Sequence, residues 1–135
     1  MSAIRWTPAL AIGHAEIDEQ HRELFRRVAA LLEAMTEGDG TAATRLFDYL
    51  GTYAADHFAA EEQLMRESSF PGLTVHKAAH DRFVRDYQAL KELHHSSGAN
   101  GAVTVKAKSW LVEWLQKHIG NTDVQLARYL VKKAG

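Results

Sequence analysis

Apolar residues recur every three or four positions in four stretches of the chain, and short polar segments separate these stretches. That spacing predicts amphipathic helices rather than strands. We expect helices at about 18–35, 42–67 and 74–95, and a fourth from about 103 to 118. The connecting segments contain glycine, serine, asparagine and proline, which predict turns.

Four helices of roughly 20 residues joined by short loops favour an all-α fold, the antiparallel up-down-up-down four-helix bundle. A chain of 135 residues can bury such a core, so we expect one domain spanning 1–135. Asp18 and Thr41 are the expected N-caps of the first two helices. Residues 1–16 show no sustained period and predict an N-terminal arm whose Trp6 packs on the rest of the protein.

The end of the fourth helix carries an unusual spacing. His118 and Asp123 are five residues apart, which separates them by about 140° on a continuous α-helix. Gly120 and Asn121 tolerate helix-ending conformations, so we expect a break there. Asn121 or Thr122 would then cap a short C-terminal helix, and the carboxylate of Asp123 would turn back toward the core.

Composition narrows the partners and the chemistry. The net charge is −1 and basic residues alternate with acidic ones, so neither nucleic acid nor an anionic membrane is indicated. We find no signal-peptide pattern and no stretch that could span a bilayer, so we expect a cytoplasmic protein, and we expect a monomer. The chain has no cysteine, which excludes disulfides, thiolate zinc sites and cysteine-ligated iron–sulfur clusters. Any metal must therefore take nitrogen and oxygen ligands.

Two pairs of polar residues lie on faces that are otherwise apolar. His57 and Glu61 are four residues apart, as are His76 and His80, so each pair points to one side of its helix. Burying imidazoles and a carboxylate without partners costs several kcal/mol. Hydrogen bonds, ion pairs or a metal ion would offset that cost.

Each of these residues also has an ordinary structural explanation. A lone histidine such as His21 is more often a hydrogen-bonded residue than a ligand. Glu61 could be a surface charge paired with Arg66 or Lys77, but Glu62, one residue further round the helix, is the better candidate for that role. We therefore expect Glu61 to face inward.

The other histidines lack partners at ligand spacing. His94 and His95 lie at the C-terminal end of the third helix, where an imidazole complements the helix dipole, and we expect both on the surface. His14 precedes the first helix and is expected to be structural or exposed. Trp110 is expected to be a core residue.

Taken together, five histidines and two carboxylates fall on core-facing stripes from all four helices, namely His21, His57, Glu61, His76, His80, His118 and Asp123. This set predicts a buried metal site in which two carboxylates are enough to bridge two ions. A site of nitrogen and oxygen ligands suits iron, manganese or zinc, and the spacing alone does not choose among them.

The order of these residues resembles the hemerythrin family, in its single-domain bacterial form, bacteriohemerythrin. The family pattern of a first histidine followed by HxxxE, HxxxH and HxxxxD appears as His21, His57 to Glu61, His76 to His80, and His118 to Asp123. The resemblance covers nearly the whole chain and includes the segment 17–21 that leads into the first histidine.

The resemblance implies a cofactor of two iron ions joined by an oxo or hydroxo bridge. One iron would be held by His76, His80 and His118, the other by His21 and His57, and Glu61 and Asp123 would bridge both. The second iron would keep an open position, where dioxygen binds end-on and reversibly as a hydroperoxide hydrogen-bonded to the oxo bridge. Phe25, Trp114, Leu115 and Ile119 are the candidates for an apolar pocket that limits access of water and protons.

The leading expectation is a non-enzymatic protein that binds dioxygen for storage, transport or delivery, with an oxygen-consuming enzyme as a candidate recipient. Ferritin-like oxidases use four carboxylates and paired ExxH motifs, whereas this chain has a single ExxH at 92–95. One alternative is a diiron oxidoreductase that reduces peroxide or nitric oxide, although no reductase docking patch is evident. The other is a sensor of oxygen, redox state or nitric oxide. The absence of a fused output domain is an argument against the sensor.

Overall fold

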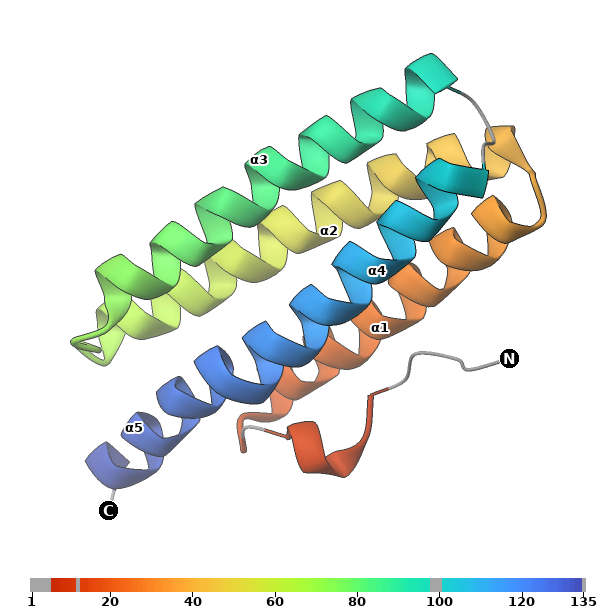
Figure 1. Ribbon diagram of the computed structural model, residues 1–135. Helices are drawn as coiled ribbons and strands as arrows, with labels where there is room; N and C mark the ends of the chain where they lie inside the picture. The colour runs from red at the N-terminus through yellow and green to blue at the C-terminus, as the bar shows by residue number, and fades with distance from the viewer. Residues whose placement is uncertain (1–5, 12, 98–100, 135) are drawn as a thin grey trace.

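The computed structural model describes residues 6–11, 13–97 and 101–134, and those residues contain helices and no strand. The elements are η1 (Pro8–Leu10), α1 (Ala15–Thr36), α2 (Gly40–Glu67), α3 (Leu73–Ser97), α4 (Gly101–Lys117), the π-helical η2 (His118–Asp123) and α5 (Val124–Ala134). The four long helices run side by side, each antiparallel to the next, and α5 continues the line of α4 (Figure 1). The predicted four-helix bundle is therefore confirmed.

The apolar stripes meet along the axis of the bundle. Leu31 of α1, Phe47 of α2 and Leu111 of α4 are at most 1% exposed, and Phe83 of α3 is 5% exposed. The segment before α1 also contacts this core, because Trp6 packs against it and lies 4.3 Å from the guanidinium of Arg22. The prediction for Trp6 is confirmed, whereas residues 1–5 and 12 of the predicted arm lie outside the described residues. None of the described helices is long and apolar enough to cross a membrane.

The first two helices begin earlier than predicted, because their caps lie further upstream. His14 is the N-cap of α1, and its Nδ1 accepts a hydrogen bond from the backbone N–H three residues on, at 3.3 Å. Asp39 caps α2 in the same way at 3.1 Å. The predicted caps Asp18 and Thr41 are therefore wrong, since both lie inside the first turns of their helices.

The predicted break after His118 is also wrong. The chain passes from α4 through η2 into α5 without leaving the helix. A π-helix bonds residue i to residue i+5, so the fifth residue takes the place that the fourth has in an α-helix. Asp123 thereby reaches the face of His118, and its Oδ1 lies 3.1 Å from His118 Nε2. The predicted C-terminal helix is present as α5.

Candidate metal centre

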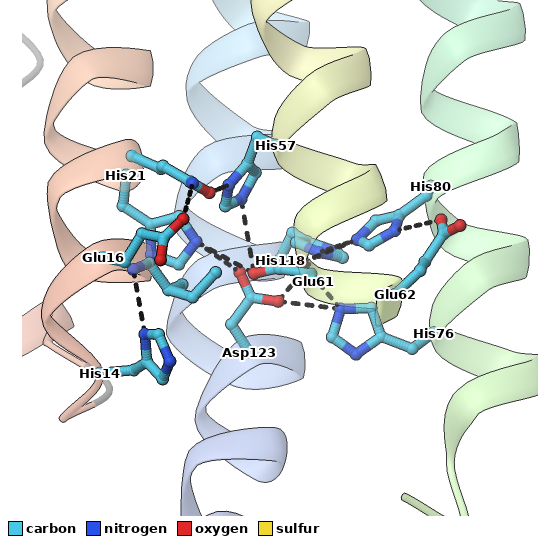
Figure 2. Close-up of polar contacts among 12 residues, drawn as sticks. His14, Glu16, His21, His57, Glu61, Glu62, His76, His80, His118 and Asp123 are labelled. Carbon is cyan, nitrogen blue, oxygen red and sulfur yellow. Dashed lines mark hydrogen bonds and ion pairs between the residues drawn. The ribbon is translucent and has the colours of Figure 1, made fainter. Parts of the chain in front are cut away.

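The seven predicted ligand residues converge at the end of the bundle near α5 (Figure 2). α1 provides His21, α2 provides His57 and Glu61, α3 provides His76 and His80, and η2 provides His118 and Asp123. All seven are buried, with at most 5% of the side chain exposed. Their ligand atoms form two groups, each within 4.8 Å: His76, His80 and His118 with Glu61 and Asp123, and His21 and His57 with the same two carboxylates.

Glu61 lies between the two groups and presents one oxygen to each. Its Oε2 is 3.2 Å from Nε2 of His21 and 3.4 Å from Nε2 of His57. Its Oε1 is 3.0 Å from Nε2 of His80 and 3.4 Å from Nε2 of His76. The carboxylate therefore has the orientation of a bridging ligand.

Asp123 repeats this arrangement from the opposite side. Its Oδ2 is 3.0 Å from Nε2 of His21. Its Oδ1 is 2.9 Å from Nε2 of His76 and 3.1 Å from Nε2 of His118. Both carboxylates thus face both groups of histidines, which is the geometry that two metal ions sharing two bridges would need.

The polar atoms at the centre fit metal ligation better than they fit one another. Glu61 Oε1, both carboxylate oxygens of Asp123 and His76 Nε2 are buried. Each lies within ion-pair distance of a neighbour in the site, but none forms a well-aligned hydrogen bond among the described residues. Such atoms are expensive to bury unless something else satisfies them. Two ligand atoms that each lie about 2.1 Å from one ion, at right angles, would be about 3.0 Å apart. The observed separations of 2.9 to 3.4 Å between nitrogen and oxygen match that value.

Without a metal, protons would take its place. Burial lowers the pKa of His21, but the carboxylates of Asp123 and Glu61 beside it raise that pKa from 6.5 to about 9. Burial likewise lowers the pKa of His76, and the same two carboxylates raise it to about 9. Burial raises the pKa of Glu61 and of Asp123, yet the surrounding imidazoles hold both below their ordinary values. A metal that binds here would therefore displace protons.

Two residues that support the ligands were missed by the sequence analysis. Nδ1 of His57 lies 2.7 Å from Gln20 Oε1, and Nδ1 of His80 lies 3.0 Å from Glu62 Oε2. The prediction that Glu62 is a surface charge paired with a lysine or arginine is wrong, since its side chain is 14% exposed and contacts His80. Their sequence positions could have indicated this role. Gln20 and Glu62 each directly adjoin a ligand residue in the sequence, and each contacts a ligand histidine on the following helix.

His94 was also misplaced by the sequence analysis. It is 2% exposed, its ring lies 5.0 Å from that of Phe47, and its Nε2 is 3.3 Å from Thr44 Oγ1. The surface prediction is therefore wrong for His94, although His95 is exposed. Neither residue joins the metal-ligand groups found among the described residues.

Three of the four predicted pocket residues belong to the hydrophobic core, and the fourth, Trp114, packs against it. Phe25, Leu115 and Ile119 are at most 3% exposed. Trp114 is half-buried and stacks on His118, with ring centroids 4.4 Å apart. Phe58, which the sequence analysis did not single out, stacks on His80 at 4.0 Å. His80 and His118 thus each stack on an aromatic ring.

Comparisons with known proteins agree with this geometry. A family model described as the hemerythrin HHE cation binding domain matches residues 13–130. A bacteriohemerythrin of Stenotrophomonas maltophilia is 30% identical over 91% of this chain and 78% of its own length. A hemerythrin-like protein of Naegleria gruberi is 30% identical over 92% of this chain and 91% of its own. A crystal structure of a hemerythrin point mutant aligns with a TM-score of 0.81 at 26% identity, covering 96% of this chain and 98% of that one. The chain therefore belongs to the hemerythrin family.

Proposed function

We propose that this protein holds two iron ions and binds dioxygen reversibly at one of them. The observation that carries the proposal is the pair of ligand groups that share Glu61 and Asp123. One group has three histidines and the other has two, so one ion would have a ligand fewer and an open position. Two ferrous ions would supply the two electrons that dioxygen accepts on binding and returns on leaving.

The surrounding residues favour reversible binding over reduction of dioxygen. Glu61 and Asp123 are the only carboxylates in the two groups found among the described residues, and both face histidines of both groups. No further acid in these groups is left to deliver protons, which reduction of dioxygen to water or peroxide would consume. The rings of Phe58 and Trp114 and the buried side chain of Ile119 would keep water away.

On this basis we propose storage or carriage of dioxygen, rather than catalysis, as the role of the protein. An oxygen-consuming enzyme would be the recipient. Relatives from Stenotrophomonas maltophilia, Naegleria gruberi and Naegleria fowleri carry hemerythrin names, which supports a shared use of this site.

The test is an optical spectrum of the iron-loaded protein, recorded after reduction without oxygen, then in air, then after oxygen is removed. We expect two irons per chain and charge-transfer bands that appear with oxygen and vanish without it. Bands that appear once and persist as a ferric spectrum would contradict reversible binding. That outcome would favour the oxidoreductase or the redox-sensor alternative.

A further inference from the structure

The two ligand groups differ in the hydrogen bonds that hold their histidines from outside. His57 and His80 each direct Nε2 toward Glu61 and Nδ1 away from it. The outer partner of His57 is the amide oxygen of Gln20, at 2.7 Å, whereas that of His80 is the carboxylate of Glu62, at 3.0 Å. Each group therefore contains one histidine that is held by a side chain.

His21 and His76, one from each group, do not offset this difference. Nδ1 of His21 and Nδ1 of His76 are buried without a hydrogen-bond partner among the described residues. The contact of Glu62 with His80 is also not a by-product of a surface ion pair, because the nearby Lys77 pairs with Asp81 at 3.0 Å. Figure 2 shows Glu62 on the outer side of His80, away from the centre of the site.

A carboxylate and an amide act differently on a ligand histidine. A hydrogen bond from an imidazole N–H to a carboxylate is charge-assisted, and it makes the imidazole a stronger electron donor to a bound metal. The amide oxygen of Gln20 carries no net charge and fixes the orientation of His57 with a smaller electronic effect. The group with three histidines thus also receives the extra negative charge.

We propose that Glu62 and Gln20 are positioning residues that set unequal reduction potentials at the two halves of the metal site. Glu62, through His80, favours the ferric state on the side of the three histidines. Gln20, through His57, leaves the side with the open position easier to keep ferrous. The inference rests on the proposed occupancy by two irons, but not on reversible binding of dioxygen.

The experiment exchanges the two outer partners in the full-length, iron-loaded protein and measures reduction potentials optically, without oxygen. Glu62→Gln is expected to raise the lower of the two potentials, and Gln20→Glu to lower the higher one. We expect each to change the ferric-to-ferrous ratio at fixed potential about tenfold, which is about 59 mV for a one-electron couple. A variant that carries both Glu62→Gln and Gln20→Glu should show both shifts, with the lower potential raised and the higher one lowered.

Asp81→Asn provides a matched control. Asp81 follows His80 directly, but its carboxylate is exposed and pairs with Lys77, so its removal deletes a nearby charge without touching a ligand. Its potentials should equal those of the unmodified protein. Shifts in Glu62→Gln no larger than in this control would overturn the proposal, as would shifts of the same sign in Glu62→Gln and Gln20→Glu.

Loss of iron has a defined meaning in this design. An unmodified chain that takes up fewer than two irons overturns both the proposed function and this inference. If the Glu62→Gln variant alone fails to bind two irons, the Gln20→Glu variant decides the question. The proposal requires its added carboxylate to lower the higher reduction potential, which a merely loosened site would not do. The two variants could shift the reduction potentials in opposite directions while oxygen reacts irreversibly. That result would support this inference and contradict only the proposed reversible binding of dioxygen.

Discussion

Ile119 follows the ligand His118 directly and is 1% exposed, which places an apolar side chain beside that ligand. A polar side chain there should admit water and speed oxidation of the oxygen-binding form. We expect Ile119→Asn to raise the autoxidation rate about tenfold, which is about 1.4 kcal/mol of activation free energy. The rate is measured from the growth of the ferric spectrum in air.

The control for this change lies on α4, the helix that leads into η2. Val105 of α4 is 69% exposed, so Val105→Asn should leave autoxidation unchanged. Equal rates in Ile119→Asn and the unmodified protein would remove Ile119 from the proposed pocket.

The buried charges predict how the stability of the metal-free protein depends on pH. Burial lowers the pKa of His21 and His76, but their carboxylate neighbours raise both from 6.5 to about 9. A group whose pKa is raised by folding stabilises the folded protein fully at pH values below its pKa in the unfolded chain. That stabilisation is lost as the pH rises through its pKa in the folded protein. The metal-free protein should therefore lose stability between about pH 6.5 and pH 9.

Glu61 and Asp123 affect the stability of the metal-free protein at acidic pH. Their pKa values lie below the ordinary 4.5 and 3.8, so their contribution is present above those values and is lost as the pH falls. Urea unfolding of chelator-treated protein should show greatest stability between about pH 4.5 and pH 6.5. Iron-loaded protein is the control, since metal-bound imidazoles carry no titrating proton in the alkaline range. A flat profile in the metal-free protein would rule out charged imidazoles in the site.

At the scale of single residues, the sequence predicted the inward-facing ligands better than their surroundings. His57 and Glu61 could be placed because the i,i+4 spacing sets their common face. Glu62 and His94 could not, because their environment depends on how neighbouring helices are rotated. Glu62 meets His80 of α3, and His94 is covered by Phe47 of α2.

At the scale of helices, α5 holds the turn between α2 and α3, which together carry four of the seven ligand residues. Tyr129 Oη donates to the carbonyl oxygens of Ser68 and Ser69, at 2.8 and 3.1 Å, and Lys133 Nζ donates to that of Ser68 at 2.7 Å. Tyr129→Phe removes the hydroxyl and should lower the free energy of unfolding by about 1 kcal/mol. Tyr49 is 54% exposed, so Tyr49→Phe serves as the control and should change little. Equal stabilities of the two variants, measured in urea, would mean that α5 does not anchor this turn.

Helix boundaries were predicted to within a few residues, but the details at their ends were not. Asp18 and Thr41 have the side chains of N-caps, yet His14 and Asp39 upstream already supply that hydrogen bond. The five-residue spacing of His118 and Asp123 indicated that the helix is irregular there. The preference of glycine and asparagine for helix ends then led to the prediction of a break. A π-helical turn solves the same geometric problem while keeping the helix continuous, and no local preference in the sequence distinguishes the two.

At the scale of the whole molecule, the bundle has two unlike ends. The site end buries a cluster of imidazoles and carboxylates, whereas the other end is closed by apolar packing and one histidine, His94. His80 and His94 are 14 residues apart on α3, or about 21 Å along the helix. Metal binding and packing should therefore stabilise the protein as separate contributions.

This separation can be tested with four samples: the unmodified protein and His94→Ala, each with and without iron. Iron at about 100 times its dissociation constant should add about 2.7 kcal/mol to the free energy of unfolding for each ion bound. His94→Ala removes a buried ring and should cost about 2 kcal/mol. Because the two changes lie far apart, their sum should hold within about 0.5 kcal/mol in urea unfolding. A larger discrepancy would mean that metal binding tightens the packing around Phe47 as well, so that the bundle responds to its metal along its whole length.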